Sequence, residues 1–325
     1  MKKKLLAILL AAGMALNLAG CGSGAAGDGA GAAAGASGSD DVYDVGIITI
    51  AYTDEFCTLL AKNIEKQLNG MGGYSVTLTD GKNDPQTQID LINTFITKDV
   101  DAIILQAADC AGVVPGVKAC NDAGIPLICC EVIPTEGDFT YTGPSNFAAG
   151  EMQANLLMEM LPEGGNVVYL EGTNGMTHAL QRKEGFVETI SDKFTILDSQ
   201  DADFVKDEGM RITEAWIQKY TEGNGVSFDA VICGNDQMAL GAMEALKTAG
   251  IPDGEIIIMG IDGTAPCIQA VADGKMACSI YQSGDHVADI TIDCIKKLQA
   301  GETLDKEYLI DWEMVNADNC KDYMQ

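Results

Sequence analysis

The stretch FDAVICGNDQMALGAMEALKTAGIP, residues 228–252, holds the pattern that decides the fold. It begins with a short apolar run, residues 230–233, that is typical of a buried strand in a parallel sheet. A polar turn follows, and apolar residues then recur at helical spacing as far as Gly250. Parallel α/β sheets bind their ligands at such strand-to-helix turns. We therefore expect Asn235 to face a ligand, whereas Asp236 is equally well explained as the cap of the helix.

The same alternation of strand and helix runs along the chain twice. Strands are predicted at residues 42–51, 74–79, 102–106, 125–131 and 139–142, and again at 166–170, 194–200, 230–233, 255–261, 277–281 and 308–312. Two such series predict an α/β fold of two doubly wound, Rossmann-like lobes joined by a hinge of several short crossings. We expect the N-terminal lobe to hold residues 42–145 and 283–309, and the C-terminal lobe to hold residues 146–282 and 310–325.

Residues 1–20 have the parts of an export signal. Three lysines follow Met1, and residues 5–16 form an apolar run that is too short to span a bilayer. The sequence LAGC at residues 18–21 resembles a bacterial lipobox. This resemblance implies cleavage before Cys21 and acylation of that residue, which would anchor an extracytoplasmic protein to the cell membrane. The alternative is an ordinary signal peptide that happens to end in Cys.

A low-complexity tract follows the lipobox. Residues 22–39 are almost entirely Gly, Ala and Ser, with a single Asp28. Such a tract lacks the large apolar side chains that a core requires. We therefore expect residues 21–41 to be a flexible tether between the anchor and the first lobe.

Composition excludes one class of partner. The 325 residues include 48 Asp and Glu against 20 Lys and Arg, which gives a formal net charge of −28. Nucleic-acid binding needs clustered Lys and Arg, so we expect no nucleic-acid partner. The length exceeds that of one ordinary domain and suits two.

No residue pattern indicates catalysis or a metal. The ten cysteines after Cys21 form no C-x-x-C pair, and the two histidines, His178 and His286, lie far apart. The chain has no phosphate-binding glycine loop, nucleophile elbow or H-E-x-x-H motif. We expect no enzyme activity, catalytic residue, metal or cofactor. The cysteines indicate buried thiols in a reducing habitat, or a few disulfides whose pairing stays open.

Polar and aromatic residues gather where predicted strands end. They are Asp54, Phe56, Glu131, Asn235, Asp262 and Gln282. Carboxylates and amides bond several hydroxyls at once, and an aromatic ring covers the apolar face of a sugar. Each residue alone is explained as a cap or a loop residue, but together they line the carboxyl edges of two facing lobes. The set therefore predicts a site for a small polar ligand.

Several segments make the resemblance to a known family specific. They are GIITIAYTDEF, LTDGKNDP, AIILQAAD, AGIPLI, LEGTNGMTHALQRKEGF, DADF, ICGNDQMALGAMEALKTAGI, MGIDGT and SIYQ. From residue 42 to about residue 314 the chain resembles type I periplasmic binding proteins, most closely the ribose-binding branch. The resemblance implies a monomer whose hinged lobes close on a monosaccharide and deliver it to an ABC transporter permease.

The family's binding residues carry over onto this chain by position. The resemblance implies that Phe56 and Phe204 sandwich the sugar, and that Asn235, Asp262 and Gln282 bond its hydroxyls.

Three positions depart from the family pattern. Glu131 and Val132 stand where the family has an Asp-Arg pair, and Cys57 replaces a second aromatic residue. Leu180 stands at the position of another arginine, although Arg182 lies two residues further on and stays a candidate for the site. Both ligand-gripping arginines are thus expected to be absent. The ligand is then expected to be neutral or weakly cationic and different from ribose, such as another sugar, a polyol or an amino sugar.

Other functions remain open from the sequence. A sensor component that presents its ligand to a membrane receptor or kinase would share this fold and differ only in its partner. A hydrolase on a doubly wound fold is disfavoured because the nucleophile elbow is missing. A transcription regulator is excluded because an export signal is present and no helix-turn-helix precedes the first lobe.

Overall fold

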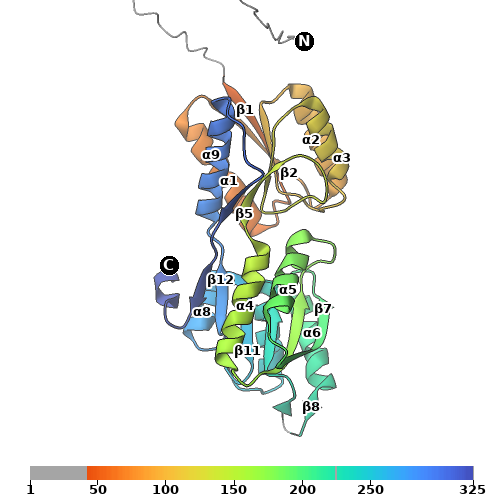
Figure 1. Cartoon of the computed structure of the whole chain (residues 1–325), viewed down its shortest axis with the longest axis vertical. Coiled ribbons are helices and arrows are strands. Elements are labelled where there is room, and N and C mark those ends of the chain that lie inside the picture. The colour runs from red at the N-terminus through yellow and green to blue at the C-terminus, as the bar shows by residue number, and fades with distance from the viewer. Residues whose placement is uncertain (1–41, 224, 325) are drawn as a thin grey trace, which may run out of the picture. The chain divides into compact units, whose positions relative to one another are not determined.

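The computed structural model describes residues 42–223 and 225–324, which form two α/β lobes (Figure 1). The expected signal peptide, the acylated Cys21 and the tether lie outside the described residues. Within the described ranges, no helix is both long enough and apolar enough to cross a membrane. The predicted fold class, two doubly wound lobes built on parallel sheets, is confirmed.

The first lobe contains a parallel sheet with the strand order β13-β5-β4-β3-β1-β2. Its strands are β1 (Tyr43–Thr49), β2 (Tyr74–Asp80), β3 (Ala102–Leu105), β4 (Leu127–Cys130), β5 (Thr140–Pro144) and β13 (Glu307–Ile310). Its helices are α1 (Glu55–Met71), α2 (Pro85–Lys98), α3 (Val114–Ala123) and α9 (Gly284–Gln299).

Both faces of the first sheet are covered (Figure 1). Ile47 packs in the cluster with α1 and α9, whereas its neighbour Ile48 packs in the cluster with α2 and α3. Successive side chains of a strand point to opposite faces. A strand covered on both sides therefore reads as a continuous apolar run, which is why β1 was predictable from sequence.

The second lobe contains a sheet with the strand order β14-β12-β11-β10-β6-β7, in which only β14 is antiparallel to its neighbour. Its strands are β6 (Gly165–Glu171), β7 (Phe194–Asp201), β10 (Ala230–Cys233), β11 (Ile257–Asp262), β12 (Cys278–Tyr281) and β14 (Glu313–Asn316). Its helices are α4 (Asn146–Met160), α5 (Thr177–Thr189), α6 (Lys206–Lys219), α7 (Asp236–Thr248), α8 (Ala265–Ala272) and the 3₁₀ helix η1 (Cys320–Tyr323). A separate hairpin pairs β8 (Thr221–Glu222) with β9 (Gly225–Val226).

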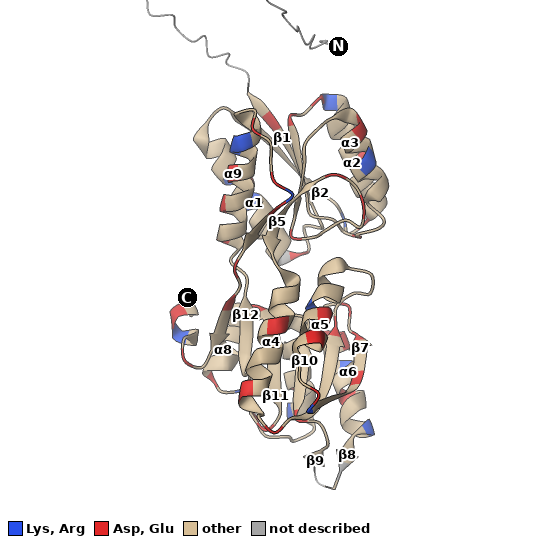
Figure 2. Cartoon of the chain, in the orientation of Figure 1, with Lys and Arg blue, Asp and Glu red and all other residues tan. Residues whose placement is uncertain are grey.

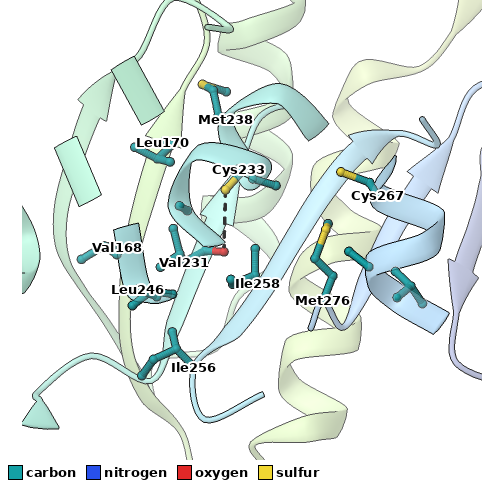
Figure 3. Close-up of a cluster of buried hydrophobic side chains, with 14 of the residues drawn as sticks. Val168, Leu170, Val231, Cys233, Met238, Leu246, Ile256, Ile258, Cys267 and Met276 are labelled. Carbon is teal, nitrogen blue, oxygen red and sulfur yellow. Dashed lines mark hydrogen bonds between the residues drawn. The ribbon is translucent and has the colours of Figure 1, made fainter. Parts of the chain in front are cut away.

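The core of the second lobe forms around the stretch that predicted the fold. Figure 3 shows Val231 and Cys233 of β10 in one cluster with Met238 and Leu246 of α7. Trp216 of α6 belongs to the same cluster and is completely buried. The apolar faces of α6 and α7 therefore pack together in the core of the second lobe.

The end of the chain differs from the prediction. The expected strand at residues 308–312 ends at Ile310, and a further strand, β14, follows it in the other sheet. Sequence reasoning missed β14 because it is four residues long and only Val315 in it is fully buried. The hairpin of β8 and β9 was missed because two-residue strands have no period to detect.

The chain crosses between the two sheets three times in the described residues, at 144–146, 281–284 and 310–313. These crossings are the predicted hinge. On this basis we propose the lobe boundaries stated above, residues 42–145 with 283–309 and residues 146–282 with 310–325.

Charges and cysteines are distributed differently. In Figure 2 the Asp and Glu residues occur on helices and loops of both lobes, with fewer Lys and Arg among them.

Each of the ten cysteines in the described ranges is buried and carries a free thiol. Burial raises the pKa of most of these thiols, as it does for Cys129 and Cys233, which keeps those thiols protonated. The structure therefore favours the interpretation as buried thiols over the disulfide alternative.

Helices α4 and α5 meet through two glycines. A Cβ atom on Gly150 of α4 would lie 2.0 Å from the carbonyl oxygen of Arg182, and one on Gly185 of α5 would lie 2.0 Å from that of Phe147. Both distances are far below van der Waals contact, and backbone atoms cannot turn aside. The close approach of the two helices therefore requires glycine at both positions, and it sets the depth at which α5 lies.

We predict that Gly150→Ala lowers the free energy of unfolding by at least about 1–3 kcal/mol, the usual cost of overpacking. Gly70 of α1 provides the control, because nothing lies within 4 Å of a Cβ atom there. Gly70→Ala should raise stability by about 0.5–1 kcal/mol through its better helix propensity. Urea unfolding followed by circular dichroism measures both variants. Equal stability of Gly150→Ala and the wild type would contradict the backbone contact.

Candidate functional site

One cavity of about 410 Å³ is lined by residues from both lobes. All eight residues that the sequence indicated for ligand binding line it. The first lobe contributes Asp54, Phe56 and Glu131, and the second lobe contributes Arg182, Phe204, Asn235 and Asp262. Gln282 lines it from the crossing that follows β12. Their roles toward a ligand stay a prediction, but the fold brings them together as strand-end residues of facing sheets.

Arg182 corrects the expectation about the missing arginines. Leu180, the residue at the family position, is exposed, whereas Arg182 is 6% exposed and lines the cavity. Side chains four residues apart share a helix face, so Arg182 points to the same side of α5 as His178. Arginine is thus present in this wall, although Val132 does stand in the other position.

The Arg182 guanidinium has several partners. Its Nε donates to Oδ1 of Asn146 at 2.9 Å, and its Nη1 donates to the carbonyl oxygen of Gly234 at 2.7 Å. The same Nη1 lies 3.9 Å from Oδ1 of Asp262. The guanidinium carbon also lies 5.6 Å from the ring centre of Trp312, within the range of a cation–π interaction. Arg182 therefore connects ligand-facing loops to two of the three crossings.

The structure separates the roles of Asn235 and Asp236 that the sequence left open, and it gives both the cap and the place in the cavity wall to Asn235. Asn235 is the cap of α7, because its Oδ1 accepts from the Met238 N–H at 3.0 Å. Its Nδ2 donates to the carbonyl oxygen of Phe204. Asp236, a candidate for both the cap and the cavity wall, is neither.

Asp236 is fully buried and anchors the loop after β11. Its Oδ2 accepts from the N–H and the hydroxyl of Thr264 at 2.7 and 2.9 Å, and its Oδ1 accepts from the Ser279 hydroxyl at 2.7 Å. Burial raises the pKa of Asp236, and these hydrogen bonds lower it in part. The anchored loop directly follows Asp262, the last residue of β11, so Asp236 positions a cavity residue without lining the cavity itself.

Two carboxylates at the cavity are held at unusual backbone angles. Glu131 has φ 70° and Asp262 has φ 125°, a region that favours glycine. Burial raises the pKa of Glu131 to about 8, against the opposing effects of Arg182 and of the Gln282 amide that donates to its Oε2. Burial also raises the pKa of Asp262, Arg182 lowers it, and Asp236 and Asp54 raise it further. Asp54 caps α1 by accepting from the Cys57 N–H at 2.8 Å.

His178 is a cavity residue that the sequence did not indicate for ligand binding. Its ring stacks on Phe204 with 5.0 Å between centres and 11° between planes. Burial, with a smaller effect of Arg182, lowers the pKa of His178 to about 3, so the imidazole stays neutral. Phe204 fits there because Gly172 has no Cβ, which would lie 1.9 Å from the phenyl ring. The glycine turn is recognisable in the sequence, but the sequence does not show that the Phe204 ring fills the space beside Gly172.

The two lobes touch beside the cavity. The hydroxyl of Thr177, the first residue of α5, donates to the carbonyl oxygen of Ile133 at 3.0 Å. Its N–H donates to Sγ of Cys110 at 3.2 Å, and Met176 packs against the core of the first lobe. Among the described residues, no group of His, Cys, Asp and Glu is placed to hold a metal ion.

Comparison with known proteins decides the family. A family model described as periplasmic binding protein domain matches residues 45–303, most of the chain. The chain belongs to the periplasmic binding protein family. It is similar to the ribose import binding protein of Escherichia coli strain K12, with 28% identity over 273 residues that cover 83% of this chain and 90% of that protein.

Two further periplasmic binding proteins extend the comparison. The fructose import binding protein of Bifidobacterium longum is 29% identical over 330 residues, which cover 98% of this chain and 96% of that protein. An ABC transporter solute-binding protein from Bacillus halodurans, solved with bound myo-inositol, has a TM-score of 0.79 and 27% identity, covering 89% and 99% of the two chains. The predicted family, with its type I two-lobe architecture, is therefore confirmed.

The buried carboxylates predict an unusual dependence of stability on pH. A carboxyl whose pKa is raised on folding adds stability below its ordinary pKa and loses it as pH rises through the folded value. Glu131 has an ordinary value of 4.5 and a folded value of about 8, and Asp236 and Asp262 shift the same way. We expect the Tm without ligand to fall between about pH 5 and pH 8.5, by roughly 2–4 °C for each kcal/mol lost.

Thermal denaturation across this pH range tests the expectation. Glu131→Gln should flatten the slope because it removes one of the titrating groups. Asp253→Asn removes an exposed carboxylate outside the cavity and should leave the slope unchanged. A Tm that is constant or rises with pH would show that these carboxyls titrate normally.

Proposed function

We propose that this protein is an extracytoplasmic solute-binding lipoprotein of an ABC transporter. It captures a small hydroxyl-rich ligand, a monosaccharide or a similar molecule, by closure of its lobes and delivers the ligand to the permease. The observation that carries the proposal is the cavity of about 410 Å³ whose polar and aromatic wall comes from both lobes. The family membership and the sugar-importing relatives support the same conclusion.

The chemistry of the wall suits such a ligand. Phe56 from the first lobe and Phe204 from the second offer apolar faces to the C–H side of a ring. Asp54, Glu131 and Asp262 offer oxygens that accept hydrogen bonds from hydroxyls. Hydrogen bonds to charged groups contribute about 1.5–3 kcal/mol each, so a few support micromolar affinity after the costs of association. Because the wall comes from both lobes, only a closed hinge makes all the contacts.

Charge limits the choice of ligand. A carboxylate or phosphate would meet the carboxylates of the wall in a partly desolvated cleft, where repulsion is poorly screened. Arg182 lies in this wall, but it is already bonded to Asn146 and Gly234. We therefore keep the proposal that the ligand is neutral or weakly cationic and different from ribose. No catalytic step is part of the proposed function.

Calorimetric titration with ribose, neutral hexoses, inositol and a sugar phosphate tests the function, and Asp262→Ala tests the site. We expect a neutral compound to bind, and Asp262→Ala to raise its Kd at least tenfold, about 1.4 kcal/mol. Asp262 is the clearest probe, because Asn235 also caps a helix and Gln282 also holds Glu131.

Asp253→Ala, at an exposed loop residue outside the cavity, is the control and should bind normally. Absence of binding by all compounds would count against the function, and tight binding of ribose or of the phosphate would overturn the ligand assignment. An Asp262→Ala protein that unfolds but binds normally per folded molecule would make Asp262 structural.

We further propose that Cys21 carries the lipid anchor and that the protein acts as a monomer. The motif at residues 18–21 supports the anchor. Cys21→Ser should move the protein from the membrane fraction to the soluble extracytoplasmic fraction, because acyl chains hold by buried methylene groups. Immunoblots of cell fractions measure the change, with Cys57→Ser, at a buried thiol of the folded chain, as the control. Unchanged fractionation of Cys21→Ser would refute the anchor.

A further inference from the structure

The cavity wall holds more acidic than basic side chains. Four carboxyl side chains line it, those of Asp54, Glu131, Asp203 and Asp262, whereas Arg182 is the one Lys or Arg among the described residues of its wall. His178 adds no positive charge, because its imidazole stays neutral. One guanidinium therefore faces four carboxyls.

The charge of Arg182 is largely committed to the protein itself. Its Nε and Nη1 donate to Asn146 and to the Gly234 carbonyl oxygen, and Asp262 is its one carboxylate partner, at 3.9 Å. Asp54 and Glu131, in the other lobe, have no ion pair with it. The guanidinium thus forms its ion pair within the second lobe, whereas it acts on Glu131 of the first lobe only through its charge, without a hydrogen bond.

The remaining carboxyls face one another from opposite lobes. Glu131 belongs to the first lobe and Asp262 to the second. The charge of Asp262 raises the pKa of Glu131 across the cavity, and the charge of Asp54, also in the first lobe, raises the pKa of Asp262. Ionisation of both carboxyls would place like charges on two surfaces that must close together, which opposes closure and favours the protonated form. A neutral ring relieves this repulsion only through the hydroxyls that it donates.

One carboxyl oxygen has no partner in the protein. Oε2 of Glu131 accepts from the Gln282 amide, but Oε1 is buried without any hydrogen bond. A buried carboxylate oxygen without a donor is costly, which favours the protonated form of Glu131 as long as no ligand is bound. Because Glu131 lines the cavity, a positively charged donor of the ligand would reverse this preference.

We propose that the ligand carries a protonated amine, as an amino sugar or an amino polyol does, and that Glu131 and Asp262 hold the ammonium group between the lobes. Three N–H donors on one positive centre match carboxylates that approach from two sides. This inference rests on the proposed function and narrows its ligand class. Glu131 is then a specificity-determining residue that selects an amine over a hydroxyl.

A proton accompanies the binding of such a ligand. The groups that face Glu131 are Arg182 of α5, Asp262 after β11, Gln282 after β12, Tyr141 of β5 and Cys57 of α1. Burial in this surrounding raises the pKa of Glu131 to about 8, so the carboxyl holds its proton at pH 7. The arriving ammonium favours the carboxylate, and the displaced proton goes to the buffer. A neutral ligand displaces no proton.

Titration calorimetry at pH 7 with matched pairs tests the inference. The pairs are glucose and glucosamine, galactose and galactosamine, and myo-inositol and an aminodeoxyinositol, with N-acetylglucosamine as an uncharged amide. We expect one amine at least to bind tenfold or more tightly than its hydroxyl parent. Its binding enthalpy should differ between phosphate and Tris buffers in the sense of proton release. Glu131→Gln should reduce the tenfold preference to less than about threefold.

Asp253→Asn is the matched control, since it removes the same formal charge at an exposed site outside the cavity and should keep the preference. If every parent binds at least as tightly as its amine, the inference fails and the proposed function stands. If no compound of either kind binds, both fail. If an amine is preferred but releases no proton and keeps its preference in Glu131→Gln, the assignment of Glu131 is overturned. The buffer comparison uses the wild type, so it decides even where Glu131→Gln does not fold.

Discussion

The buried guanidinium of Arg182 is the interaction on which the rest of the site depends. It bonds the loop after β10 through Gly234, reaches Asp262 after β11, and contacts the hinge at Asn146 and Trp312. Trp312 in turn donates from Nε1 to the Ser145 carbonyl oxygen at 2.6 Å, which ties two crossings together. A planar group with five donors suits this task, whereas a lysine would offer a single point charge. The cavity wall and the hinge thus share one side chain.

Several packing constraints hold Arg182 and its neighbours in place. Gly150 and Gly185 let α4 and α5 approach until backbone meets backbone, which fixes the depth of the helix that carries Arg182 and His178. The buried carboxyl of Asp236 accepts hydrogen bonds from Thr264, in the loop that follows Asp262, and from Ser279. Several carboxyls at the cavity, among them Glu131 and Asp262, are partly desolvated in this arrangement. Such an arrangement favours a ligand that brings hydrogen-bond donors, because the protein supplies mainly acceptors.

The sequence predicted the fold and the location of the site because both follow from strand periodicity. Asn235, Asp262 and Gln282 end buried strands, and the carboxyl ends of parallel strands meet at one edge. The sequence could not separate Asn235 from Asp236 as the cap, since both residue types serve and only tertiary contacts with Thr264 and Ser279 decide.

The other differences between the structure and the sequence-based predictions also arise from long-range contacts. The placement of Arg182 depended on the rotation of α5, and the stacking of His178 on Phe204 joined segments with no local signal. Strand β14 was missed because its pairing with β12 is visible only after the chain has crossed the hinge.

Because Arg182 contacts both the cavity wall and the hinge, we expect a ligand bound between the lobes to act on the hinge through Arg182, and tryptophan fluorescence measures this effect. The chain has two tryptophans, Trp216 in the core of the second lobe and Trp312 in the hinge beside Arg182. Titration with a hydroxyl-rich ligand should change the emission saturably, with one site per chain. The change should persist in Trp216→Phe and disappear in Trp312→Phe. A ligand that binds without altering the emission, or a change that survives in Trp312→Phe, would contradict the account.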